Sequence, residues 1–199
     1  PNGKELFECK YDRSDLDHDI RQYSDDIVLS LSKRPGIATS QIAFVSNKNG
    51  RHEIYVCDYD GRNIRQITRN GRKNVLPAIS PRGESLVHTT HAPGYADLLM
   101  IDLTGGRPSP LVRQSGAKTE AEFSPDGERV AYTRQRAGTD RQVPAVYVTD
   151  AQRGGEGQQV HQSERALYGL RWSPDGETLS AVETTMTGNF ANVGMLLVD

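Results

Sequence analysis

Few residues in this sequence have the types and spacing that catalysis or metal binding requires. Ser30 and Lys33 match an S-x-x-K pattern, but they lie at the end of a predicted helix, where a chance match is the simpler interpretation. His88 and His91 form an H-x-x-H pair. Residues three apart on a strand face opposite sides, so these two imidazoles are not expected to share a metal ion. Neither pattern predicts an active site.

Two polar loops have some features of cation-binding turns. Asn47, Asn49 and Glu53 lie in SNKNGRHE, whose spacing departs from that of a calcium loop, so a plain hairpin is the preferred interpretation. Asp58 and Asp60 in DYDG predict a tight turn first and a cation site second. The sequence contains neither a G-x-S-x-G nucleophile elbow nor a phosphate-binding glycine-rich loop. We therefore expect no catalytic residue, no metal and no cofactor.

The strongest pattern is a repeated turn, S-P-x-G, which begins at Ser80, Ser124 and Ser173 and recurs after 44 and 49 residues. Proline presets φ for the second position of a tight turn, and glycine accepts the positive φ that other residues resist. Apolar and β-branched residues flank each turn. Each copy therefore predicts a tight turn between two strands.

A second marker keeps the same register. An apolar run ends in aspartate at Asp58, Asp102, Asp150 and Asp199, with spacings of 44, 48 and 49 residues. A period of about 40–50 residues with four strands per unit is typical of a β-propeller blade. The sequence therefore predicts a mainly β chain whose scaffold is a β-propeller.

The repeat also predicts where the strands lie. The expected strands are 42–46, 53–58 and 64–68 in the first unit; 75–80, 85–89, 98–102 and 110–113 in the second; 120–124, 129–134, 145–150 and 158–162 in the third; and 169–173, 178–182 and 194–199 in the fourth. The first unit lacks its innermost strand and the fourth its outermost. About three and a half blades are therefore expected here, from a longer chain.

The segment before the repeat has a different pattern. A strand is expected over residues 4–11, followed by a helix over 15–33 that Ser14 or Asp15 caps and that Pro35 and Gly36 end. The helix has one apolar face at a helical period. We interpret residues 1–40 as the C-terminal part of an N-terminal α/β domain and residues 41–199 as incomplete propeller blades.

Composition excludes some classes of partner. The net charge is −2, so no basic field is expected to hold nucleic acid. No apolar run approaches the roughly 20 residues of a membrane span, so we expect no direct membrane insertion. Cys9 and Cys57 lack metal-ligand spacing. Buried free thiols are the simpler interpretation, and a disulfide is the alternative.

The loops on one face of the propeller are the candidate binding surface. Loops between blades (70–75, 115–120 and 163–168) and between second and third strands (46–52, 91–96, 135–144 and 184–193) share that face, and they are long and mixed in charge. The predicted innermost strands carry mostly apolar residues, among them Ala78, Phe123 and Leu170. That composition argues against a propeller enzyme with a metal in its channel.

These residues resemble a known family. The helix, the junction PGIATSQIAFVS over residues 35–46 and the segment EIYVCDYDG over residues 53–61 are similar to the junction between the α/β domain and the propeller of TolB. The resemblance implies a propeller of six blades when complete. It also implies a non-catalytic, periplasmic member of the Tol-Pal system, which binds a peptidoglycan-associated lipoprotein (Pal) through the propeller and TolA through its own N-terminus.

The resemblance also implies a set of partner-binding residues. The family's loop before the second of these turns aligns with Ala117, Lys118, Thr119 and Glu120, and the loop before the third aligns with Leu167 and Tyr168. Lys73 and Asn74, from the preceding loop between blades, complete the set. The alternative is the propeller of a prolyl-oligopeptidase-like serine peptidase whose catalytic domain lies outside this chain.

Overall fold

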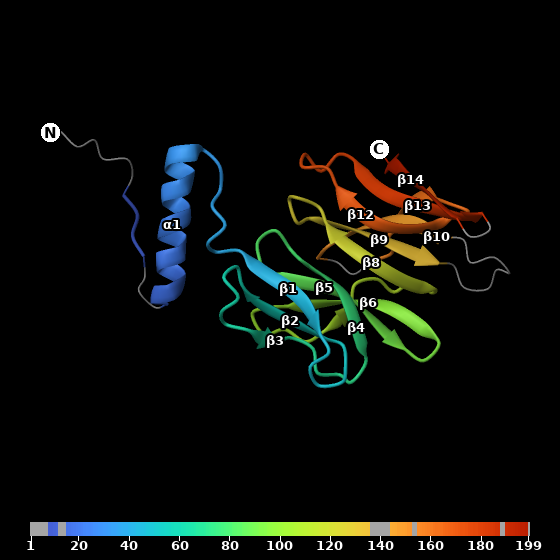
Figure 1. Ribbon diagram of the computed structural model, residues 1–199, viewed down its shortest axis with the longest axis horizontal. Helices are drawn as coiled ribbons and strands as arrows, with labels where there is room; N and C mark the ends of the chain where they lie inside the picture. The colour runs from blue at the N-terminus through green and yellow to red at the C-terminus, as the bar shows by residue number, and fades with distance from the viewer. Residues whose placement is uncertain (1–7, 12–14, 136–143, 153–154, 188–189, 199) are drawn as a thin grey trace. The chain divides into compact units, whose positions relative to one another are not determined.

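The computed structural model describes residues 8–11, 15–135, 144–152, 155–187 and 190–198 (Figure 1). These residues form one helix and fourteen strands. The chain divides into two compact units: residues 1–42 with 56–65, and residues 43–55 with 66–199. The first unit contains the helix, and the second contains most of the strands.

The helix α1 spans Leu16–Ser32. Its N-cap is Asp15, whose carboxylate accepts a hydrogen bond from the backbone N–H of His18 at 3.1 Å, as expected for an aspartate that satisfies a free helical N–H. The helix ends at Lys33, which adopts a left-handed conformation with φ of 60°. The predicted helix is thus confirmed. Of the strand expected over residues 4–11, residues 8–11 form no strand, and residues 4–7 lie outside the described residues.

The apolar side chains of α1 lie largely in solvent, although the sequence predicted a packed face. Asp25 is the buried residue of this helix. Its carboxylate accepts hydrogen bonds from the N–H groups of Ala38 and Thr39 at 2.7 and 2.9 Å, and from the Thr39 hydroxyl at 2.7 Å. These bonds tie the helix to the segment that follows it. Six apolar side chains are exposed: Leu16, Ile20, Tyr23, Val28, Leu29 and Leu31.

The strands form four antiparallel sheets (Figure 1). The first, β1-β2-β3, consists of Gln41–Ser46, Glu53–Asp58 and Arg65–Gln66. The second, β4-β5-β6-β7, consists of Lys73–Ile79, Ser85–Ala92, Tyr95–Asp102 and Ser109–Pro110. The third, β8-β9-β10-β11, consists of Ala117–Phe123, Arg129–Gln135, Pro144–Asp150 and Gln158–Gln162. The fourth, β12-β13-β14, consists of Ala166–Trp172, Leu179–Thr187 and Phe190–Val198.

This order confirms the predicted propeller blades. Within the described part of the chain, the first sheet has no innermost strand and the fourth no outermost strand, as the repeat indicated. The strand β8 packs against both β4 and β12, so the innermost strands of three consecutive blades are neighbours. Figure 1 shows the third sheet, with β8–β10, between the second sheet and the fourth. The chain is therefore mainly β, an open part of a propeller.

Several sequence predictions about strand and loop lengths are wrong. The loop expected over 91–96 is mostly strand, and the loops expected over 70–75, 115–120 and 163–168 are shorter, because β4, β8 and β12 begin within them. The outer strands β3 and β7 contain two residues each, Arg65–Gln66 and Ser109–Pro110, instead of the segments 64–68 and 110–113. The loop expected over 184–193 is mostly strand, since the pairing of β13 with β14 continues to Thr187 and Phe190. The run of β-branched threonines at the end of β13 favours this extension. The loop 135–144 falls largely outside the described residues, which include only its ends.

The S-P-x-G turns have the conformation that their residue types predict. In each, the glycine N–H donates to the carbonyl of the serine at 2.8 or 2.9 Å, and the glycine φ is 73° to 76°. In the second turn, the carboxylate of Asp126 also accepts a hydrogen bond from the N–H of Glu128 at 3.0 Å. A Cβ built on Gly127 would lie 3.3 Å from Cδ of Pro81. Successive turns therefore also contact one another across the blades.

The core lies between successive sheets. One cluster joins the second and third sheets and includes Val87, Leu98, Phe123, Val130 and Tyr132. Another joins the third and fourth sheets and includes Ala131, Val146 and Leu170. Val130 and Tyr132 face one way and Ala131 the other, as the alternation of side chains along a strand requires. Cys57 is buried and Cys9 is exposed, and both are free thiols, so the prediction of burial holds for Cys57 alone.

Candidate partner-binding face

The eight candidate residues lie in the first halves of three innermost strands. Lys73 and Asn74 begin β4, Ala117–Glu120 begin β8, and Leu167 and Tyr168 lie near the start of β12. The same half of each strand emerges from a loop between blades. The structure therefore places all eight on three neighbouring strands, although their side chains have different surroundings.

Each of these strands contains a bulge at the same place in the repeat. Leu76, Glu120 and Gly169 have φ of 53°, 51° and 68°, and the strand pairing shifts register beside each of them. They are 44 and 49 residues apart, the spacing of the S-P-x-G turns. A bulge changes the direction in which neighbouring side chains point. Gly169 is the one residue of the three whose type indicates positive φ.

Glu120 connects three blades through hydrogen bonds. Its backbone N–H donates to the hydroxyl of Thr89 in the second sheet at 3.2 Å. Its carboxylate accepts from the N–H of Gly169 in the fourth sheet at 2.5 Å. A charged acceptor strengthens a hydrogen bond of this kind. Glu120 therefore helps to set the spacing of the loops that emerge beside it.

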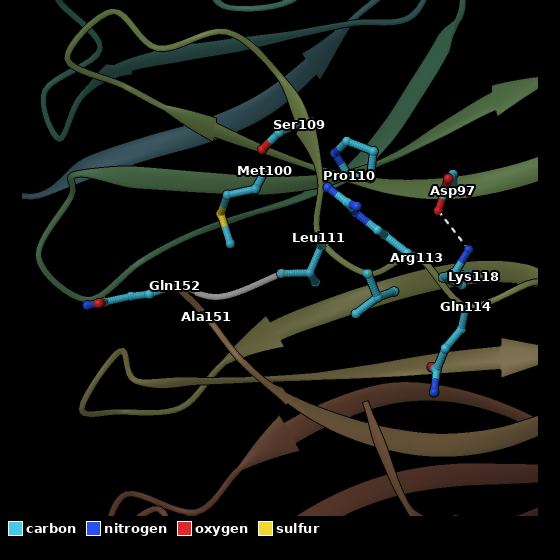
Figure 2. A pocket seen from close by; sticks show the side chains of 11 residues that line it. Asp97, Met100, Ser109, Pro110, Leu111, Arg113, Gln114, Lys118, Ala151 and Gln152 are labelled. Atoms are coloured by element: carbon cyan, nitrogen blue, oxygen red, sulfur yellow. Dashed lines mark hydrogen bonds and ion pairs between the residues drawn. The ribbon is translucent and has the colours of Figure 1, made fainter. Parts of the chain in front are cut away.

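Lys118 is a buried cation whose partner is a partly exposed carboxylate. Its Nζ lies 2.9 Å from Oδ1 of Asp97 and 3.3 Å from the carbonyl oxygen of Gly116, and its side chain is 5% exposed. Figure 2 shows this pair at the wall of a cavity. The sequence did not indicate Asp97 as a partner, because the two residues are on different blades. Lys118 holds the loop before β8 in place.

Asn74 is also buried, within a polar cluster around Glu53. Its Nδ2 lies 3.0 Å from Oε2 of Glu53, and that carboxylate also accepts from the hydroxyl of Thr68 and from the N–H of Gly71. Asn74 itself is 0% exposed. Its side chain therefore positions the loop that carries Lys73.

His88 lies in the same part of the sheet. It is fully buried, and its two ring nitrogens have no hydrogen-bond partner among the described residues. Burial lowers the pKa of His88 to about 4, and the negative charge of Glu53 opposes that change. His88 is therefore neutral at neutral pH.

Only some of the eight candidate residues are exposed to solvent. Lys73 is exposed, Tyr168 is 44% exposed, and Leu167 packs partly against the core between the third and fourth sheets. Sequence reasoning missed Tyr95, which is 50% exposed and whose hydroxyl accepts from Nη1 of Arg72 at 3.4 Å. An aromatic residue directly after Pro93-Gly94 in a predicted turn was the available signal.

A cavity of about 440 Å³ opens beside these residues. It is lined by Gly94 of the β5–β6 turn, residues 95–97 of β6, residues 114–118 before and at the start of β8, and Gln135 at the end of β9. Ala117 and Lys118 are the two candidate residues in its wall. Its walls combine polar and apolar groups.

Some residues of the motifs considered for catalysis and metal binding have structural partners. Nζ of Lys33 donates to the backbone carbonyl of Ser30 at 3.0 Å. Arg21 forms ion pairs with Asp58 and Asp60. Among the described residues, no group of three or more His, Cys, Asp or Glu residues could hold a metal ion. No helix in the described part of the chain is long and apolar enough to cross a bilayer.

Comparison with known proteins supports this architecture. A "Tol-Pal system protein TolB" of Desulfosudis oleivorans is 41% identical over 88 residues, which are 44% of this chain and 20% of the relative. A "Protein TolB homolog" of Chlorobium luteolum is 32% identical over 174 residues, 87% of this chain and 37% of the relative. The chain therefore spans about a third or less of the length of these relatives.

A solved structure gives the same result for the fold. The crystal structure of TolB from Acinetobacter baumannii has a TM-score of 0.66 and 19% identity over 88% of this chain and 43% of its own. The family model described as the TolB beta propeller domain matches residues 17–196, nearly the whole sequence. The chain belongs to the TolB β-propeller family.

Proposed function

We propose that this propeller is a non-catalytic protein-binding scaffold of a Tol-Pal system in the periplasm. Its partner is a Pal-type lipoprotein, and a TolA-type protein is the partner of the whole molecule. The names of the relatives support the assignment to the system. The match to the TolB propeller favours this function over the peptidase alternative.

One structural observation carries the proposal of a binding face. Three neighbouring innermost strands have matching bulges, and the exposed side chains of Lys73 and Tyr168 lie on the first and last of them. Lys73 and Tyr168, with Tyr95 and Arg72, supply aromatic and cationic groups, which are common at the energetic centres of protein interfaces. In this proposal Asn74, Lys118 and Glu120 position the face, and Lys73 and Tyr168 contact the partner.

The test is titration of the full-length protein with the soluble domain of its Pal-type lipoprotein, followed by calorimetry. Tyr168→Ala is expected to weaken binding by about tenfold or more, and Lys73→Glu by a smaller factor. The matched control is Arg82→Glu, because Arg82 is an exposed residue of the opposite S-P-x-G face. A loss as large in the control, or the absence of saturable binding by the wild type, would contradict the proposal.

A further inference from the structure

Two segments of the first and second blades carry a cluster of exposed cations. The loop over residues 46–52 joins β1 to β2, and residues 69–73 lead from β3 into β4. Neither segment contains an aspartate or a glutamate. The exposed lysine and arginine residues of the two segments, called the basic patch below, are Lys48, Arg51, Arg69, Arg72 and Lys73.

Contacts between the two segments bring these cations together. The N–H of Asn74 donates to the carbonyl of His52 at 3.0 Å, which joins β4 to the end of the first segment. A Cβ built on Gly71 would lie 2.6 Å from Nη1 of Arg51, so this guanidinium lies against the second segment. The basic patch is therefore one continuous surface.

The positive charge of the basic patch is not neutralised locally. Among the described residues, none of its five cations forms an ion pair. The adjoining carboxylate, Glu53, is 5% exposed and accepts hydrogen bonds from Thr68, Gly71 and Asn74. One buried carboxylate beside five exposed cations leaves an excess of positive charge. The net charge of −2 for the chain therefore conceals a local positive field.

The opposite end of the blades has the reverse charge. In the described part of the chain, the exposed carboxylates of the S-P-x-G turns and of the strand ends beside them are Glu84, Asp102, Asp126, Glu128, Asp150, Asp175 and Glu177. The exposed arginines described at this end are Arg82, Arg107 and Arg129. Carboxylates outnumber arginines there. The two ends therefore attract groups of opposite charge.

The composition of the basic patch favours a protein surface as its partner. Three of its five cations are arginines, whose planar guanidinium can bind a carboxylate through two parallel hydrogen bonds. Arg72 lies beside the exposed Tyr95, and both residue types are enriched at protein interfaces. Neither segment has a large apolar side chain that could insert into a bilayer. An acidic protein surface therefore complements the patch.

We propose that the basic patch attracts a carboxylate-rich surface of the propeller's protein partner and speeds its association. The identity of this partner rests on the function proposed above. Charges at the rim of an interface act mainly on the association rate, because they attract the partner before contact is made. Salt screens this attraction over about 10 Å at an ionic strength of 0.1 M. The patch therefore affects the rate of binding more than its final strength.

The test is a stopped-flow measurement of association between the full-length protein and the soluble domain of its Pal-type lipoprotein. The association rate constant is expected to fall about tenfold or more from about 20 mM to about 500 mM salt, while the dissociation rate constant changes less than about threefold. An association rate that does not depend on salt would overturn this inference alone. The absence of saturable binding would overturn the proposed function as well.

Charge-reversal variants locate the effect. Arg51→Glu combined with Arg69→Glu is expected to slow association about tenfold at about 20 mM salt and less than about twofold at about 500 mM. Arg51→Lys combined with Arg69→Lys keeps both charges and is expected to keep the wild-type rate. The matched control reverses two exposed charges at the opposite end, Arg82→Glu with Arg107→Glu. Equal slowing by this control would overturn the assignment to the patch.

The field of the basic patch can also be measured without a partner. Soluble nitroxide probes of negative and positive charge increase amide-proton relaxation according to their local concentration. The negative probe is expected to act at least about twofold more strongly than the positive one at the amides of Gly50 and Gly71, with the reverse order at Glu128 and Glu177. Equal effects of the two probes at Gly50 and Gly71 would overturn the proposal.

A vesicle experiment distinguishes a lipid surface from a protein partner. The full-length protein is expected to remain in the supernatant when vesicles of phosphatidylglycerol and phosphatidylcholine are sedimented. Sedimentation with the vesicles that Arg51→Glu with Arg69→Glu abolishes would assign the basic patch to a membrane surface and overturn the proposal.

Discussion

The carboxylate of Glu120 accepts a hydrogen bond at 2.5 Å from the backbone N–H of Gly169. The two residues occupy the same place in consecutive blades, at the bulge of the innermost strand. This bond connects one bulge to the next. The strands β8 and β12, which carry six of the candidate residues, are therefore held together at their bulges.

Removal of this acceptor is expected to destabilise the propeller. Glu120→Ala leaves the N–H of Gly169 without its partner, and we expect a loss of about 1–2 kcal/mol in the free energy of unfolding. Glu120→Gln keeps an oxygen in place and is expected to lose less than half as much. Urea denaturation of both variants measures the difference. Wild-type stability in the alanine variant would mean that the bond contributes nothing.

The bulge itself can be tested at Gly169. Its φ of 68° is unfavourable for any residue with a Cβ, although the nearest atom to an added Cβ, on Val182, is at an ordinary 3.4 Å. Gly169→Ala is therefore expected to cost about 1 kcal/mol, from backbone conformation and not from a clash. Gly155 is the matched control, since an added Cβ there meets nothing within 4 Å. The prediction is wrong if the two alanine variants have the same thermal stability.

His88 is expected to make stability depend on pH. Burial lowers its pKa to about 4 from the ordinary 6.5, so the unfolded chain binds a proton more readily than the folded chain between these values. The contribution of His88 to the free energy of unfolding therefore falls as the pH is lowered from 6.5 to 4. Denaturation midpoints at several pH values should show a smaller decrease in His88→Leu than in wild type. His52→Ala changes an exposed histidine and is expected to retain the wild-type decrease.

Asp25 is expected to link stability to pH with the same sign as His88 but at lower pH, because the pKa of each group is lowered in the folded chain. Burial alone would raise the pKa of Asp25, but hydrogen bonds from Thr39 and Ala38 lower it below the ordinary 3.8. Its contribution is therefore present above pH 3.8 and is lost as the pH falls below that value. Asp25→Asn is expected to reduce the protection of the Ala38 and Thr39 amides from hydrogen exchange at neutral pH. Asp17→Asn, at an exposed position of the same helix, should leave that protection unchanged.

The blade architecture could be predicted from the amino-acid sequence, because the features that specify it are local. The S-P-x-G turns need only proline and glycine at fixed positions, and the alternation around them predicts strands. The helix was predicted from the cap at Asp15 and the apolar period. Repetition of these local signals at one spacing was enough to indicate propeller blades. The candidate residues were expected in the loops between blades, whereas the structure places them at the starts of the innermost strands.

The exposure of each candidate side chain, by contrast, depends on how the blades pack in the tertiary structure. Asn74 and Lys118 look like surface residues in the sequence, yet each is buried against a carboxylate, Glu53 or Asp97, from a distant strand. The left-handed conformations of Leu76 and Glu120 likewise have no signal in residue type. Packing of one blade against the next imposes these features. They depend on contacts between residues far apart in the chain, which propensity and spacing do not encode.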